Sequence, residues 1–340
     1  MSYICPSDKT ILLLGCGLCT AAMIKYFNNY GYNVNIATRT PSKSEPIIAK
    51  CRFPNLVKAS PLDLSAPDME TKLEELISKS DLVISMLPYI FHVQAAKISI
   101  RLKTHFCTSS YISPEMKALD SDAKAAGVCL INECGVDPGL DHMSAMKVVD
   151  DIAEQNGKVI KFWSICGGLP APEFNDNPFG YKFSWAPRGV LLASRNGAKY
   201  LADGKIVEFP GSELYAYENV VSDHFENVGE LEWTYNRDSV CFIDEYQKPA
   251  LKDVKTMVRG TYRYKGWCRT MKMIADLKLT SEEKLDLKDK SYSDFMKMVL
   301  GSEGSETIQQ TIKRKILGSV EFGSGHSDLF KKEFEEALER

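Results

Sequence analysis

A glycine-rich turn near the N-terminus has the residue types and spacing of a phosphate-binding loop. It follows an apolar run and contains Gly15, Cys16, Gly17, Leu18 and Cys19, with Thr20 in place of a third glycine. The first glycine of such a turn allows a sharp bend, and the second lets the backbone approach a pyrophosphate at a helix start. A lone glycine pattern can also be a purely structural turn. We therefore expect these residues to bind a dinucleotide, provided that the neighbouring elements form the matching fold.

A basic residue follows the next apolar run, at the position that usually discriminates between NAD and NADP. Arg39 and Thr40 stand where NAD-preferring sites place Asp or Glu on the ribose hydroxyls. A guanidinium can hold a 2′-phosphate by charge-assisted hydrogen bonds. The sequence therefore favours NADPH, and a solvated surface arginine is the alternative interpretation.

The cysteines and histidines do not form a metal-binding pattern. Ten cysteines are scattered singly, except for Cys16 and Cys19, and the five histidines show no ligand spacing. No second cysteine pair or nearby histidine completes a tetrahedral set with Cys16 and Cys19. Asp141 and His142 are adjacent on an expected helix and would point to different faces. We expect no metal site.

Separated arginines in the second half suit a substrate with several negative charges. Arg188, Arg237 and Arg263 lie in different segments of the chain. If they converge, the substrate is polyanionic; any single arginine is more often a surface charge. A long glycine- and proline-rich segment, 166–185, has the character of a binding loop.

Alternating strands and helices are expected to position the first group of residues. Between residue 10 and about 133, short β-branched runs alternate with helical patterns, which predicts a parallel sheet with crossover helices. The expected strands are 11–15, 33–38, 56–59, 81–87, 105–108 and 128–132, and the helices between them include 18–30, 69–79, 91–102 and 114–126. This order predicts a doubly wound Rossmann sheet, whose ligand binds at the carboxyl ends of the strands.

The length of the chain indicates how many domains it contains. At 340 residues about two domains are expected. We predict an α/β Rossmann domain at 1–134, an α+β substrate domain at 135–276 with strands near 158–166, 206–209 and 257–264, and a charged helical segment at 277–340, including 329–340.

The charge and hydropathy argue against nucleic-acid and membrane partners. Net charge is −3, with 42 basic and 45 acidic residues and no long basic run. No apolar run reaches the roughly 18 residues that a membrane helix needs, and the polar N-terminus lacks the blocks of a secretory signal. We expect a cytoplasmic enzyme with a small-molecule substrate.

Five motifs together resemble glutamate-forming saccharopine dehydrogenases, also called saccharopine reductases. They are residues 81–89, 108–114, 135–142, 166–173 and 181–185. The similarity extends from about residue 10 to residue 269. Members of this family continue past the length of this chain, so the sequence predicts either a truncated product or a tail, 277–340, that replaces the family's further elements. Missing strands would leave a sheet edge or a core face uncovered.

The resemblance implies an activity and roles for particular residues. The activity is NADPH-dependent reduction of the imine that joins L-glutamate and 2-aminoadipate 6-semialdehyde, or the reverse oxidation of saccharopine, in lysine biosynthesis by the aminoadipate pathway. The resemblance adds as cofactor-binding residues Leu62, Asp63, Ser109, Asp137 and Gly139. It implies as substrate-binding residues Ser110, Tyr111, Asp137, Arg237, Thr261, Tyr262 and Arg263. Saccharopine carries three carboxylates, which gives separated arginines a physical purpose.

Three residues are candidates for proton transfer at the imine, namely Tyr111, Asp137 and Cys166. None has an obvious activator in the sequence, and the substrate amine or a water can move the proton instead. We therefore expect them to act first as positioning residues. Two other functions stay open: an NADPH-dependent enzyme of another amino-acid imine, such as a carboxynorspermidine-type substrate, and a non-catalytic NADPH-binding paralogue. A homodimer is compatible with either.

Overall fold

A computed structural model of the chain describes residues 8–318. They form two compact units, and the chain passes between these units more than once. The first unit runs to Met146 and also includes Ser184–Ala186, whereas Lys147–Phe183 and the chain from Pro187 form the second.

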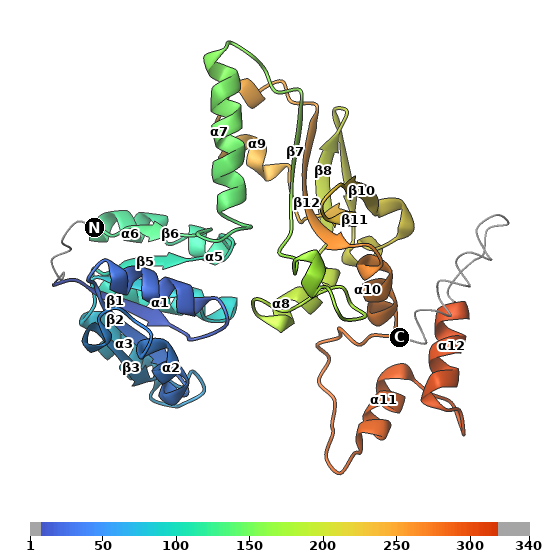
Figure 1. The fold of residues 1–340 in the computed structure, drawn as a ribbon, viewed down its shortest axis with the longest axis horizontal. Coiled ribbons are helices and arrows are strands. Elements are labelled where there is room, and N and C mark those ends of the chain that lie inside the picture. Colours follow the sequence, from blue (N-terminus) through green and yellow to red (C-terminus); the bar gives the residue numbers. More distant parts are fainter. Residues whose placement is uncertain (1–7, 319–340) are drawn as a thin grey trace. The chain divides into compact units, whose positions relative to one another are not determined.

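The first unit is built on a parallel sheet of six strands in the order β3-β2-β1-β4-β5-β6 (Figure 1). The strands are β1 Thr10–Leu14, β2 Asn33–Thr38, β3 Val57–Pro61, β4 Leu82–Ser85, β5 His105–Thr108 and β6 Leu130–Ile131. The connecting helices are α1 Thr20–Asn29, α2 Glu45–Ile48, α3 Met69–Ser78, α4 His92–Arg101, α5 Pro114–Lys117 and α6 Asp120–Ala126. This order is that of the doubly wound dinucleotide fold, so the predicted Rossmann sheet is confirmed.

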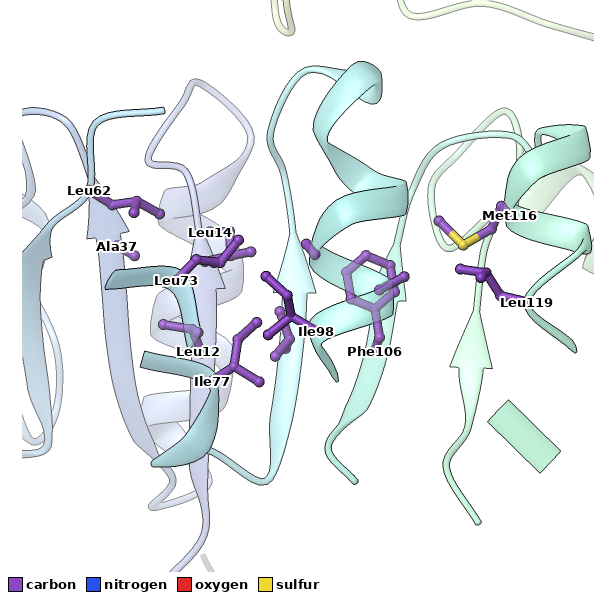
Figure 2. Packing of buried hydrophobic residues seen from close by; sticks show 13 residues of the cluster. Leu12, Leu14, Ala37, Leu62, Leu73, Ile77, Ile98, Phe106, Met116 and Leu119 are labelled. Carbon is purple, nitrogen blue, oxygen red and sulfur yellow. The ribbon is translucent and has the colours of Figure 1, made fainter. Parts of the chain in front are cut away.

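Both faces of the central strand are buried, because its side chains alternate between two apolar layers. Leu12 and Leu14 of β1 pack with α3, α4 and Phe106 of β5 in one layer (Figure 2). Ile11 and Leu13 pack in the opposite layer, which α1 and β2 complete. The near-continuous apolar run of β1 follows from this double burial.

Two predicted elements differ clearly from the structure, and the strand expected at 81–87 is shorter, since β4 ends at Ser85. The strand expected at 128–132 is reduced to β6, which pairs with β5 through two residues. The helix expected at 114–126 is divided into α5 and α6, because the Leu119 N–H bonds to the Met116 carbonyl at 3.1 Å and tightens the chain there. Met116 and Leu119 are both buried in the same layer, so this turn directs two side chains into the core.

The sheet is less well covered beside α1. A hollow of about 430 Å³ lies there, and its lining includes Met23, Phe27, Ile84, Met86 and Cys107. Burial is the main reason that the pKa of the Cys107 thiol is raised, to about 12. This surface is apolar, in contrast to the polar loops at the carboxyl ends of the strands.

The second unit contains a mixed sheet with β12 as its most extensively paired strand. The strands are β7 Lys161–Cys166, β8 Ala198–Ala202, β9 Lys205–Phe209, β10 Val221–Phe225, β11 Gly229–Tyr235 and β12 Thr256–Tyr264. They follow the order β10-β11-β12-β8-β9, and β7 pairs with β12 in parallel. The predicted strands near 158–166, 206–209 and 257–264 correspond to β7, β9 and β12, so the mixed α+β character of this region is confirmed.

Helices cover this sheet and continue beyond it. They are α7 Leu140–Glu154, which begins in the first unit, α8 Pro187–Leu192, α9 Cys241–Glu245, α10 Trp267–Asp276, α11 Tyr292–Leu300 and α12 Ile308–Gly318. Trp267 and Met271 of α10 lie in the core of the second unit, and Leu277 and Leu300 join α11 to the end of α10. The helix predicted at 329–340 lies outside the described residues. No helix within residues 8–318 combines the length and apolar character needed to cross a membrane.

Candidate functional site

The glycine turn after β1 is bent by Gly15, whose φ of +98° lies in the left-handed region. Its N–H donates to the Ala37 carbonyl at 2.8 Å, which places the turn beside the end of β2. A Cβ at this position would lie 3.1 Å from the Met86 carbonyl oxygen. Backbone conformation and close packing therefore both favour glycine at residue 15.

The next residues lie exposed at the start of α1. Gly17, Leu18 and Cys19 are exposed, and a Cβ at Gly17 would meet no atom within 4 Å. Thr20 is buried, and its hydroxyl donates to the Gly17 carbonyl at 2.8 Å, which fixes the turn. The first turn of α1 contains no acidic side chain. A helix start with exposed residues, free space at Gly17 and no acidic side chain fits a pyrophosphate.

The two cysteines of this turn have different surroundings. The Cys16 sulfur accepts a hydrogen bond from the Ser44 hydroxyl at 3.4 Å, next to the apolar layer that covers α1. The Cys19 sulfur donates to the Ser184 carbonyl at 3.2 Å, and Ser184 is part of the short segment that belongs to the first unit. Both thiols are free. Within residues 8–318, no group of His, Cys, Asp or Glu could hold a metal ion.

The loops after β2 and β3 contain the next predicted cofactor residues. Arg39 is exposed directly after β2, followed by Thr40, which is half-buried. Leu62 is 3% exposed and packs in the core, so only its backbone is available to a ligand. The Asp63 carboxylate accepts from the Ser65 backbone and hydroxyl at 2.9 and 2.7 Å. These bonds, with a smaller contribution from the Arg39 charge, lower the pKa of Asp63.

A buried histidine lies beneath the polar loop that follows β5. His92 is 4% exposed, and its Nδ1 lies 2.9 Å from the Ser85 hydroxyl oxygen. Its Nε2 lies 2.9 Å from the Ser110 hydroxyl oxygen and 3.2 Å from that of Thr108. Burial lowers the pKa of His92 to about 4, so the ring is neutral at physiological pH. Ser109, the neighbouring residue, is half-buried.

The loop after β6 is folded tightly on itself around Gly135 and Gly139. The Gly135 N–H donates to the Pro138 carbonyl at 2.8 Å, and the peptide bond between Asp137 and Pro138 is cis. A Cβ at Gly139, where φ is +149°, would lie within 2.6 Å of the Gly135 nitrogen. The Asp141 carboxylate accepts from the Gly139 N–H at 2.7 Å and fixes the start of α7. No larger residue fits at Gly139 without moving the backbone.

Two carboxylates connect this loop to the segment after β5. The Tyr111 hydroxyl donates to the Asp137 carboxylate at 2.8 Å. The Glu133 carboxylate accepts from the Ile112 N–H at 3.2 Å and lies 3.1 Å from Nε2 of His142. Glu133 itself has a φ of +60°, which is uncommon for a residue other than glycine. These contacts give the Ser110–Ile112 segment a defined backbone position.

The predicted substrate residues of the second unit lie around the end of β12. Cys166, the last residue of β7, pairs in register with Thr261. Successive side chains of a strand alternate between its faces, so Thr261 and Arg263 lie on one face and Tyr262 on the other. The Tyr262 hydroxyl donates to Asp223 at 2.6 Å, and burial together with this carboxylate raises the pKa of Tyr262 above its usual range. A ligand on one face of β12 therefore contacts only part of this set.

The two predicted arginines have different environments. The Arg263 guanidinium lies over the Tyr181 and Trp267 rings, 5.2 and 5.5 Å from their centroids, and donates to the Tyr262 carbonyl at 2.7 Å. Arg237 is exposed in the turn after β11, where its φ is +53°. The Arg263 guanidinium is held by aromatic packing, whereas Arg237 is an exposed residue.

The predicted residues are divided between the two units, and Arg237 does not lie with Arg263, because β11 runs antiparallel to β12 and Asn236 bonds to the Arg259 carbonyl. In the first unit, the loops that carry Gly17, Arg39, Ser110 and Asp137 follow the carboxyl ends of the parallel strands. Cys166, Arg237 and the end of β12 belong to the second unit. Sequence reasoning missed His92 and Glu133. In the sequence, the position of His92 at the start of a helix after a Pro-Tyr loop is only a weak indication of a role. Nothing in the sequence indicates the left-handed φ of Glu133.

Two family models match consecutive parts of the chain. The saccharopine dehydrogenase NADP binding domain matches residues 11–131, and the saccharopine dehydrogenase C-terminal domain matches residues 135–335. The second match includes most of the segment 277–340.

Fungal proteins of known activity are similar over most of the chain. Saccharopine dehydrogenase [NADP(+), L-glutamate-forming] of Pyricularia oryzae is 40% identical over 82% of this chain, and its counterpart in Saccharomyces cerevisiae is 38% identical over 92%. The chain spans 59% and 67% of the lengths of these two relatives. The solved structure of apo histidine-tagged saccharopine dehydrogenase (L-Glu forming) from S. cerevisiae has a TM-score of 0.75 and 34% identity, covering 98% of this chain and 72% of that one.

Proposed function

The chain belongs to the saccharopine dehydrogenase family, and on this premise we propose that it interconverts saccharopine with L-glutamate and 2-aminoadipate 6-semialdehyde, using NADP(H). The observation that supports this most directly is the exposed glycine turn, followed by Arg39 rather than an acid after β2. The pathway would be lysine biosynthesis from aminoadipate. Because the chain spans about 59% of the first relative named above, the activity is a proposal about this chain and needs its own test.

The residues present fit an NADP(H) molecule. The amides of Gly17 to Cys19 and the positive end of α1 would hold the pyrophosphate, and Arg39 with Thr40 would hold the 2′-phosphate. Further contacts are proposed for Leu62, Asp63, Ser109, Asp137 and Gly139; that of Leu62 would be through its backbone. The cofactor, when bound, supplies or accepts the hydride, so the protein provides binding and orientation.

The chain also offers groups for a substrate with several carboxylates. We propose that Arg237, an exposed arginine in the turn after β11, binds one carboxylate. Thr261 and Arg263 are proposed to contribute from one face at the end of β12, and Tyr262 from the other face. Ser110 would contribute a hydroxyl from the first unit, next to Tyr111.

Proton handling is proposed for the pair Tyr111 and Asp137. Their hydrogen bond of 2.8 Å holds a hydroxyl beside a carboxylate, a pairing that can fix a substrate amine in one orientation. Tyr111, Asp137 and Cys166 are kept as positioning residues first. A pH profile of turnover for Tyr111→Phe would show whether the hydroxyl also moves a proton.

Two measurements on the purified chain test this function. Calorimetry with NADPH and NADH should show tighter binding of NADPH, and saccharopine with NADP+ should produce absorbance of reduced cofactor. Saccharopine is favoured over a carboxynorspermidine-type imine because the relatives named above act on it. If the chain turned over another amino-acid imine and not saccharopine, that imine would be the substrate. Cofactor binding without any turnover would support the non-catalytic alternative.

The location and the assembly of the protein also stay predictions. A cytoplasmic enzyme and a homodimer are both compatible with the composition, and light scattering on the purified chain would test the second.

A further inference from the structure

We propose that His92 is a positioning residue that acts through Ser110: its Nε2–H holds the Ser110 oxygen, so that the Ser110 hydroxyl donates its own proton to an acceptor on the substrate. The inference concerns the first unit alone, and its consequence for substrate rests on the proposed function. His92 would act without touching the substrate.

The first step is the direction of the Thr108 hydroxyl. Thr108 is fully buried, and its Oγ1 donates to the Ser85 carbonyl at 2.9 Å. A carbonyl oxygen has no proton to give, so this bond uses the only proton of the Thr108 hydroxyl. The same oxygen accepts from the Ser110 N–H at 3.4 Å.

The second step gives the tautomer of the ring. Thr108 Oγ1 lies 3.2 Å from His92 Nε2 and has only lone pairs left to offer. If Nε2 carried no proton, two lone pairs would face each other in a buried site, which is unfavourable. Nε2 is therefore protonated. Since the ring is neutral, Nδ1 is bare and accepts from the Ser85 hydroxyl at 2.9 Å.

The protonated Nε2 of His92 determines the direction of the Ser110 hydroxyl. Its oxygen lies 2.9 Å from Nε2 and accepts the same N–H that Thr108 shares. The proton of the Ser110 hydroxyl is then not donated to the ring. Within residues 8–318, the ring nitrogen is also the only group near enough to accept that proton. The Ser110 backbone is already held, because its carbonyl accepts from Glu133 N–H at 3.1 Å and its N–H bonds to Thr108. Only the direction of the hydroxyl is left for the ring to decide.

This arrangement favours substrate groups that accept hydrogen bonds. A carboxylate oxygen can accept the Ser110 proton, whereas an ammonium group cannot. With the opposite tautomer, Ser110 would donate to the ring and could only accept from a ligand. The buried ring therefore makes the Ser110 proton available to a carboxylate, which the opposite tautomer would not do, and burial keeps the ring neutral near neutral pH.

A spectroscopic test decides the tautomer without any substrate. In protein labelled with 15N-histidine, ring nitrogen–proton correlations show which nitrogen carries a proton, and the signals of His92 are those lost in His92→Gln. We expect a neutral Nε2–H ring near neutral pH. A bare Nε2 or a doubly protonated ring would overturn the proposal, even if the chain binds no saccharopine. A chain that binds NADPH but no saccharopine would instead contradict the proposed function.

A matched pair of variants separates positioning from a merely structural role. The side chain of His92→Gln can place an amide N–H near the Nε2 position, whereas that of His92→Asn reaches only the Nδ1 position. We expect Ser110→Ala to weaken saccharopine binding roughly tenfold or more, as for loss of a hydrogen bond to a charged group. His92→Asn should weaken it several-fold, and His92→Gln should restore most of that loss.

The double variant completes the test. If His92 acts through Ser110, adding His92→Asn to Ser110→Ala should cause no further loss of saccharopine affinity. NADPH affinity and the circular dichroism spectrum should stay those of the parent in all four proteins. Equal losses for Asn and Gln, or independent losses in the double variant, would assign His92 a structural role only.

Discussion

Replacing Gly17 by alanine is expected to separate cofactor binding from folding. Gly17 has no left-handed φ, and an added Cβ meets no protein atom within 4 Å. The folded protein should therefore tolerate the methyl group, and a small gain of about 0.4–1 kcal/mol is expected from the less flexible unfolded chain. A pyrophosphate close to the amides of this turn would meet the methyl group instead. Loss of one charge-assisted hydrogen bond corresponds to roughly 1.5–3 kcal/mol, or about a 10- to 150-fold weaker affinity for NADPH.

Gly168→Ala is the matched control, because Gly168 also has no atom within 4 Å of an added Cβ and lies in the second unit. Thermal unfolding should give both variants a midpoint at or slightly above that of the parent. Calorimetry should then show weaker NADPH binding for Gly17→Ala alone. Unchanged NADPH affinity in Gly17→Ala would refute the assignment of this turn to the pyrophosphate, and a lowered midpoint would show that the space at Gly17 is needed for folding.

The other predictions concern the choice of cofactor, the binding of saccharopine and the stability of the loop after β6. Arg39→Asp should weaken the binding of NADPH by roughly 2–3 kcal/mol and change the binding of NADH little, because only NADPH has the 2′-phosphate that Arg39 would contact. Equal losses of affinity for both cofactors would contradict this prediction. Arg237→Ala should raise the KM for saccharopine about tenfold or more at unchanged NADPH affinity, and loss of NADPH binding would refute its role. Gly139→Ala should lower the free energy of unfolding by roughly 2–4 kcal/mol in denaturant titrations, since its Cβ would overlap Gly135; an unchanged value would mean that the loop adapts.

The first unit was largely predictable because its inner strands β1, β2 and β4 are buried on both faces. The bounds of β2 and β5 agree with those expected, since each is a short run limited by polar residues. The second unit was less predictable. β10 and β11 contain charged residues such as Asp223, Glu230 and Glu232, so their pairing with each other and with β12 depends on tertiary context. The division at Leu119 likewise depends on packing against α4 and cannot be seen in the helical periodicity.

The candidate site shows the same contrast. Gly15, Gly17 and Arg39 could be singled out because their roles depend on local backbone conformation and on position after a strand. His92 could not, because its partners Ser85, Thr108 and Ser110 come from other elements and its burial is a property of the folded chain. Asp141 and His142 were expected to point to different faces. Asp141 accepts from the Gly139 N–H and His142 lies beside Glu133, but Nδ1 of His142 also lies 3.9 Å from the Asp141 carboxylate.

The contact between Cys19 and the segment Ser184–Ala186 also determines what intrinsic fluorescence can report. The sequence contains four tryptophans, and Trp163, Trp233 and Trp267 all belong to the second unit. Trp185 is the fourth; it is 42% exposed and follows the residue whose carbonyl accepts from the Cys19 thiol. The emission that Trp185→Phe removes therefore comes from a single indole beside the glycine turn. Energy transfer from that indole to reduced nicotinamide would give an optical signal for events at this turn, separate from the three indoles of the second sheet domain.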